Sequence, residues 1–147
     1  MADIYAIQQK GVADGTKTPP EKADGRVVGA NKRSTFASKA TDQALATGDR
    51  LFLGFKPAGC NLVGVKATAS ASLGTTTIDI GDADTADRFV DGKTLTAVDT
   101  PTVLGPKAST LDDTPSDAQE PIWATILTAN VGAAVALTFE LEFAGVS

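Results

Sequence analysis

The stretch VALTFELEF, residues 135–143, decides the fold class of this chain, because its side chains alternate strictly between large apolar and small or polar. One face of the stretch carries Val135, Leu137, Phe139, Leu141 and Phe143. The other face carries Ala136, Thr138, Glu140 and Glu142. A period of two is the pattern of a β-strand that is buried on one side only. It predicts a strand against the core, with both carboxylates pointing outward.

A second apolar stretch, residues 122–128, precedes this strand and is separated from it by residues 129–132. Asn130 and Gly132 are turn-forming residues, so the two stretches are expected to form a hairpin. The whole region 122–144 is long enough to raise the question of a membrane span. Its period is two, and each of Glu140 and Glu142 would cost about 2.5–3.5 kcal/mol near the centre of a bilayer. A transmembrane helix is therefore not expected, and no membrane partner is predicted.

The alternation of apolar and polar side chains recurs in three earlier stretches of the chain. In residues 51–55 the odd positions are large and apolar, and in residues 75–80 Ile78 and Ile80 lie opposite Thr77 and Asp79. In residues 62–71 one face is predicted to carry Val63, Val65, Ala67, Ala69 and Ala71, and the other Leu62, Gly64, Lys66, Thr68 and Ser70. Turns are expected at residues 57–59 and 72–74, where glycine and proline occur.

The remaining elements are weaker. Residues 27–28 and 34–38 are candidate strands, residues 40–46 a candidate helical turn, and residues 81–116 a loop-rich block with short strands at 89–90, 95–98 and 103–104. No amphipathic helix of three turns and no fixed-period repeat is visible. The sequence therefore predicts an all-β protein: an antiparallel β-sandwich, of jelly-roll type.

The N-terminal part has a different composition. Residues 2–8 could form one short strand, but residues 9–25 are polar and contain Gly11, Gly15 and the pair Pro19-Pro20, which indicates an extended arm. We expect an arm over residues 1–30 and a single sandwich domain over residues 31–147. Candidate partner-binding residues of the arm are Ile4, Tyr5 and Ile7, which could add a strand to a neighbour, and Lys10, Lys17, Lys22, Arg26, Lys32 and Arg33, which could meet an acidic surface.

Charge separates the two parts of the chain. Residues 1–60 carry nine basic and six acidic side chains (net +3), whereas residues 61–147 carry four and twelve (net −8). The total of −5 argues against a nucleic-acid partner, because such binding depends on Lys and Arg that neutralise phosphates. A basic N-terminal part suggests a docking arm, with chance segregation as the alternative.

Catalytic chemistry is largely excluded by composition. The chain has no histidine, which removes Ser-His-Asp and Cys-His nucleophile systems and histidine-ligated metals. The single cysteine, Cys60, cannot form an intrachain disulfide and is expected to be a small core side chain. Glycine-rich phosphate loops are absent, and Glu140 and Glu142, about 7 Å apart on one strand face, are expected to serve solubility. We expect no enzyme activity and no cofactor.

Two other features leave alternatives open. Asp79, Asp82, Asp84 and Asp87 lie close together in sequence and could collect Ca²⁺, but their spacing differs from that of helix-loop-helix calcium sites, so a soluble acidic turn is preferred. Trp123 is the only tryptophan, and it could lie in the core or anchor an interface.

Residues 47–65, residues 73–92 with the element Asp87-Arg88-Phe89-Val90, and residues 122–143 together resemble small virion proteins of tailed bacteriophages, especially head decoration (cement) proteins. The resemblance implies a jelly-roll-like domain on the outside of the capsid. It also implies a homo-oligomer, with a trimer favoured, that bridges neighbouring subunits of the major capsid protein. The chain would be made in the host cytoplasm. The alternatives are a phage tail or head–tail connector component and a ligand- or carbohydrate-binding β-sandwich module.

Overall fold

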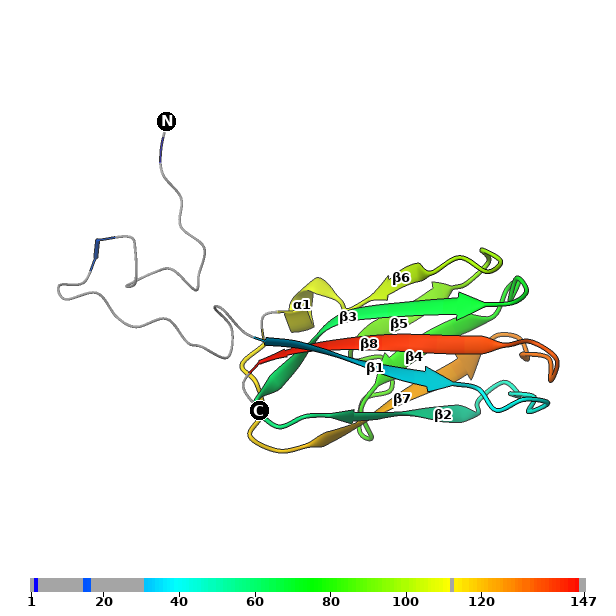
Figure 1. Cartoon of the computed structure of the whole chain (residues 1–147), viewed down its shortest axis with the longest axis horizontal. Coiled ribbons are helices and arrows are strands. Elements are labelled where there is room, and N and C mark those ends of the chain that lie inside the picture. Colours follow the sequence, from blue (N-terminus) through cyan, green and yellow to red (C-terminus); the bar gives the residue numbers. More distant parts are fainter. Residues whose placement is uncertain (1, 3–14, 17–30, 112, 146–147) are drawn as a thin grey trace.

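The computed structural model describes residues 2, 15–16, 31–111 and 113–145, and these form two facing sheets of four strands each (Figure 1). The first sheet has the order β1 (Asn31–Ser38), β8 (Leu137–Gly145), β3 (Cys60–Ala69), β6 (Thr102–Gly105). The second has the order β2 (Arg50–Lys56), β7 (Glu120–Leu127), β4 (Thr77–Gly81), β5 (Val90–Thr94). One short helix, α1 (Ala108–Leu111), follows β6. All neighbouring strands pair antiparallel, so the predicted all-β sandwich is confirmed, and a jelly roll is compatible with it.

The core lies between the sheets and is built from the alternating faces of the strands. Along β8, Leu137, Phe139, Leu141 and Phe143 are each at most 1% exposed. Residues Thr138, Glu140 and Glu142 between them are half-buried on the outer face, as predicted. Ile78 and Ile80 of β4 are fully buried in the same way. Each such side chain contributes about 1.5–3 kcal/mol on leaving water, which fixes the face that each strand turns inward.

The predicted hairpin at residues 129–132 is wrong, because β7 and β8 belong to different sheets. β7 pairs with β2 and β4, whereas β8 pairs with β1 and β3. The residues between them cross from one sheet to the other and find other partners: Val131 and Leu45 exchange two backbone hydrogen bonds, and the Ser70 N–H donates to the Ala136 carbonyl. Strand β8 consequently begins at Leu137 rather than near Ala133.

In β2 and β3, two β-bulges change which side chains face the core, so the prediction for these strands is partly wrong. The register shifts between Phe52 and Gly54 in β2 and between Leu62 and Gly64 in β3. An extra residue in a strand exchanges its inner and outer faces. Leu62 therefore lies in the core while Val63 is half-buried, and Phe55 points outward although the sequence pattern placed it with Leu51 and Leu53.

The segment between β1 and β2 does not contain the predicted helical turn. Two separate turns are present there instead, with the Gln43 N–H donating to the Ala40 carbonyl and the Asp49 N–H donating to the Ala46 carbonyl. Lys39 organises the first turn: the side chain is 6% exposed, and its ammonium donates to the carbonyls of Ala40, Gln43 and Ala133 at 3.2, 2.6 and 3.0 Å. The cation thus joins the end of β1 to the connection that leads into β8.

Other short predictions have mixed outcomes. Residues 34–38 lie in β1, and residues 103–104 lie in β6. Residues 95–98 form no strand, although Val98 makes an isolated bridge to Ala69. Residues 2–8 and 27–28 fall outside the described residues except for Ala2. Within the part of the chain that the structure describes, no helix is long and apolar enough to cross a membrane.

Candidate interaction surfaces

The outer face of the second sheet carries a cluster of exposed aromatic side chains, which we call the aromatic patch: Phe52, Phe55 and Trp123, with Arg50. The Phe52 ring lies 5.1 Å from the Phe55 ring and 5.0 Å from the Trp123 ring, centroid to centroid. The guanidinium of Arg50 lies over Trp123 at 4.4 Å. Phe52 and Phe55 remain 41% and 49% exposed. Trp, aromatic and Arg side chains are the types that most often anchor protein interfaces.

The bulge in β2 creates this patch. Positions 52 and 55 are three residues apart, so a regular strand would turn them to opposite faces. Because of the irregularity between Phe52 and Gly54, the side chains of Phe52 and Phe55 lie on the same face. Gly54 adopts a φ of 132°, which other residues rarely tolerate. Phe52 is the register partner of Trp123 on β7. Sequence reasoning missed the patch, although a glycine inside an apolar strand is a signal for a bulge.

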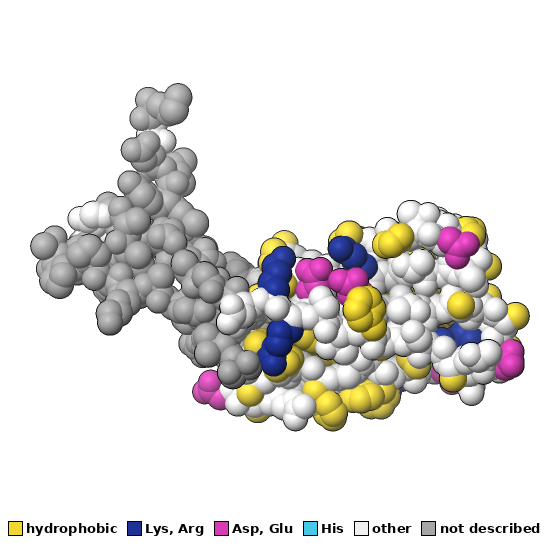
Figure 2. All heavy atoms as spheres, in the orientation of Figure 1, with side chains coloured by type: hydrophobic (Ala, Val, Ile, Leu, Met, Phe, Trp, Pro, Cys, Tyr) yellow, Lys and Arg dark blue, Asp and Glu magenta, His cyan; other side chains and the backbone are white. Residues whose placement is uncertain are grey.

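The outer face of the first sheet has a different character. Glu142 forms ion pairs with Lys32 of β1 at 3.7 Å and Lys66 of β3 at 3.9 Å. Phe36 stands on the same face and is 69% exposed. Figure 2, which views this side, shows acidic side chains over the middle of the face, basic ones around them and a hydrophobic group beside them. The two outer faces of the sandwich are therefore chemically distinct, one mixed-charge and one aromatic.

The predicted arm residues separate into two groups. Ile4, Tyr5, Ile7, Lys10, Lys17, Lys22 and Arg26 lie outside the described residues. Lys32 and Arg33 lie in β1 of the sandwich. Lys32 pairs with Glu142, and the Arg33 guanidinium donates to the Cys60 sulfur at 3.5 Å. These two cations therefore have partners inside the sandwich.

Asp79 and Asp82, two of the four clustered carboxylates, bind groups of the sandwich itself. Asp82 Oδ1 accepts the backbone N–H groups of Asp84 and Thr85, and its Oδ2 binds Arg88 at 2.9 Å. Asp79 accepts the N–H of Gly92. Burial raises the pKa of Asp82, but the hydrogen bonds from Thr85, Arg88 and Asp84 outweigh it and hold the pKa below its usual value. No group of three or more metal-ligating side chains occurs among residues 31–111 and 113–145.

Arg88 connects this loop to the start of β7. Besides Asp82 it contacts Glu120 at 3.2 Å and Asp113 at 3.8 Å. Glu120 also pairs at 3.2 Å with Lys56, whose side chain is 3% exposed and whose ammonium donates to the Cys60 carbonyl. Burial lowers the pKa of Arg88, but the hydrogen bond to Asp82 and the charge of Glu120 raise it above its usual value. The network joins three loops at one end of the sandwich and is structural.

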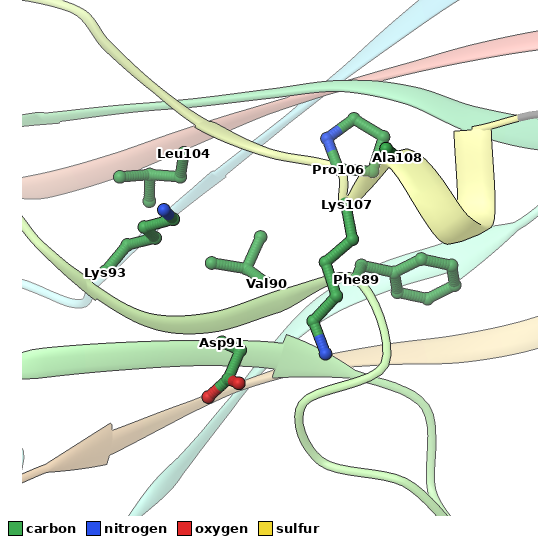
Figure 3. Close-up of a pocket in the computed structure, with 8 residues that line it drawn as sticks. All are labelled: Phe89, Val90, Asp91, Lys93, Leu104, Pro106, Lys107 and Ala108. Carbon is green, nitrogen blue, oxygen red and sulfur yellow. The ribbon is translucent and has the colours of Figure 1, made fainter.

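An open hollow of about 450 Å³ lies between the edge strands β5 and β6. Figure 3 shows Val90 and Leu104 in its wall, with the side chains of Asp91, Lys93 and Lys107 around them. Lys107 is engaged with Asp87 at 3.8 Å. The described side chains in its wall include no hydroxyl and no thiol group. Cys60, the one thiol of the chain, is 1% exposed in the core, as expected.

Solved structures with the same fold come from phage capsids. The chain superposes with a TM-score of 0.66 at 17% identity on a chain of the cyanophage Pam1 capsid asymmetric unit, covering 92% of this chain and 100% of that one. For the capsid of Ralstonia phage GP4 the values are 0.62, 12%, 92% and 96%. For the acid-stable capsid of Helicobacter pylori bacteriophage KHP30 they are 0.54, 16%, 77% and 86%. At these identities the likeness shows a shared fold.

No protein-family model matches the chain, and no curated protein is similar to it in sequence. The coverage values also indicate the size of the matched chains. Since about nine-tenths of this chain matches nearly all of the Pam1 and GP4 chains, those chains are of similar size and consist of this fold throughout.

Proposed function

We propose that this chain is a non-enzymatic structural protein of a bacteriophage virion, a decoration protein that binds the outside of the capsid and bridges neighbouring subunits of the major capsid protein. The observation that carries the proposal is the match of 92% of this chain to chains of capsid structures from two phages, at TM-scores of 0.66 and 0.62. The match also covers 100% and 96% of those chains, which supports the role of a small accessory component.

The two outer faces of the sandwich support this role. A protein on the outside of a capsid presents one surface to its neighbours and another to water. The face with Glu140, Glu142, Lys32 and Lys66 has the interspersed charges of a solvated surface. The aromatic patch, in contrast, exposes two phenylalanines and stacks an arginine on the only tryptophan, which is typical of a surface that becomes buried.

Bridging does not require a strong single contact. Many copies bound at symmetry-related positions add up, and a trimer, which we propose as the oligomer, would multiply the contacts of each chain by three. The arm over residues 1–30 is proposed to extend the reach of each copy to a neighbour. This mechanism needs neither a cofactor nor a metal.

Co-sedimentation tests the proposal. Heads of the encoding phage, prepared without this chain, are mixed with the purified full chain, pelleted and assayed for bound protein and for thermal rupture. We expect saturable binding with a fixed number of copies per head and a higher rupture temperature. Binding to purified tails but not to heads would contradict the proposal and favour the tail or connector alternative.

A further inference from the structure

We propose that the aromatic patch is the docking site for the apolar segment Ile4–Ile7 of a second copy of this chain. This deepens the proposed function and rests on it, because arm exchange between copies would link neighbours on the capsid.

The patch has the properties of a docking site. Phe52, Phe55 and Trp123 form one continuous aromatic surface, and β2, which carries both phenylalanines, is an edge strand that pairs only with β7 among the described residues. An extended segment can lie beside an edge strand and place alternate side chains on its outer face. In an extended Ile4-Tyr5-Ala6-Ile7, Tyr5 and Ile7 share one side, which would set them against Phe52 and Phe55.

The segment is also the fitting occupant by composition. Within residues 1–25 it is the one run of four apolar residues, and it carries no charge. The rest of residues 1–30 contains four basic and four acidic side chains. The net charge of +3 over residues 1–60 therefore comes from residues 31–60, and charge does not support the acidic partner surface that the sequence suggested for the arm. Its apolar run must then supply most of the contact energy, and an aromatic surface is the matching partner.

Asn31, the residue that follows the arm in the chain, lies at the end of the sandwich where the patch ends. Asn31, the first residue of β1, is the register partner of Gly145, which also pairs with Cys60 at the start of β3. The turn at residues 57–59 joins Cys60 to the end of β2 that carries Phe55. The start of β1, to which the arm is joined, and Phe55 of the patch therefore lie at the same end of the sandwich.

The length of the arm favours a second copy over the same chain. Two facing sheets lie ~10 Å apart, so a few residues would suffice to reach from β1 to the β2 of the same sandwich. Residues 8–30 separate Ile7 from Asn31, and when extended they span ~75 Å at ~3.3 Å per residue. The effective concentration of a tethered segment falls as its linker lengthens, and Pro19-Pro20 stiffens this linker. Such a linker fits a neighbouring molecule.

Complementation between two full-length variants tests the inference. The first variant, I4S/Y5S/I7S, lacks the segment; the second, F52S/F55S, lacks the patch. A third, F36S, removes a phenylalanine of the other sheet that is even more exposed, at 69%, and is the control. Thermal melting establishes that each variant is folded. Association is followed by sedimentation velocity and by the emission of Trp123, the only tryptophan and itself part of the patch.

We expect the parent chain and F36S to associate, and each of the first two variants alone to associate at least about tenfold more weakly. An equimolar mixture of those two should regain association and shift the Trp123 emission, because the intact segment of one docks on the intact patch of the other. No recovery on mixing, or unchanged association of either variant, would overturn the inference. Capsid binding is measured separately, so loss of the proposed function and loss of arm docking are distinguishable.

Discussion

The side chain of Glu142 lies over Gly64 on the neighbouring strand. The two residues are register partners on β8 and β3, and a Cβ added to Gly64 would come within 3.0 Å of Glu142 Oε2 and 3.3 Å of Glu142 Cβ. The missing side chain at position 64 gives the carboxylate room to lie between Lys32 and Lys66, with which it forms ion pairs. Gly64 thus shapes the charged outer face of the first sheet.

Replacing this glycine should disturb the face through Glu142. We expect Gly64→Val to lower the free energy of unfolding by about 1–2 kcal/mol, because the new side chain would overlap the carboxylate. In an E142A background the same substitution should cost clearly less, since the obstacle is gone. Urea unfolding of the four chains in this double-mutant cycle measures the coupling. An equal cost in both backgrounds would show that the strain lies elsewhere.

Lys39 should be far more important for stability than a surface lysine. Its buried ammonium supplies donors to three backbone carbonyls, and Lys39→Met would leave them without these partners. We expect a loss of about 2–3 kcal/mol. Lys66→Met, at a side chain that is 45% exposed, is the control and should change the free energy of unfolding by less than about 0.5 kcal/mol. Similar losses in the two variants would contradict this role.

The contribution of Asp82 to the free energy of unfolding depends on pH. The native pKa lies below the unfolded value of 3.8, so its contribution is complete above pH 3.8 and is lost as the pH falls through the native pKa. Asp82→Asn should therefore cost about 1 kcal/mol near neutral pH, where the charged hydrogen bond to Arg88 is lost. The difference from the parent should shrink in acid below the native pKa. Urea unfolding at neutral and at strongly acidic pH, with exposed Asp84→Asn as control, measures both.

Glu120 compensates a buried cation. Glu120→Gln would leave the ammonium of Lys56, whose side chain is 3% exposed, without its carboxylate, and we expect a loss of about 2 kcal/mol. Glu140→Gln is the matched control, because Glu140 forms no ion pair with the residues that the structure describes. Thermal unfolding compares the two. If the double variant with K56M is as unstable as Glu120→Gln alone, the unpaired charge is not the cause.

Much of the fold was predictable because burial acts residue by residue. The alternation in β8 and β4 fixed which side chains face the core, and the structure confirms it at Phe139 and Ile80. A period of two does not reveal which strand lies beside which, so the crossing from β7 to β8 was missed and a hairpin was predicted in its place. The bulges at Gly54 and Gly64 were missed for a related reason, since a single added residue reverses a face without changing composition.

The candidate surfaces were less predictable than the fold. The aromatic patch joins Phe52 to Trp123, which are far apart in the chain, and depends on a bulge and on a strand pairing that the sequence pattern does not specify. The sequence pointed to Lys32 and Arg33 as arm residues because charge alone does not show which cations already have partners. The roles proposed for residues 4–26 stay predictions.

The crossing from β7 to β8 also affects the order in which the protein can fold. β8 lies between β1 and β3, and β7 between β2 and β4, so in each sheet an interior strand comes last in the chain. Until a ribosome has made residues 120–145, the nascent polypeptide can complete neither sheet, and the apolar faces of the earlier strands stay uncovered. Such non-local pairing folds slowly and exposes strand edges meanwhile. The uncovered apolar faces of the nascent chain would therefore be available to chaperones until its synthesis is nearly finished.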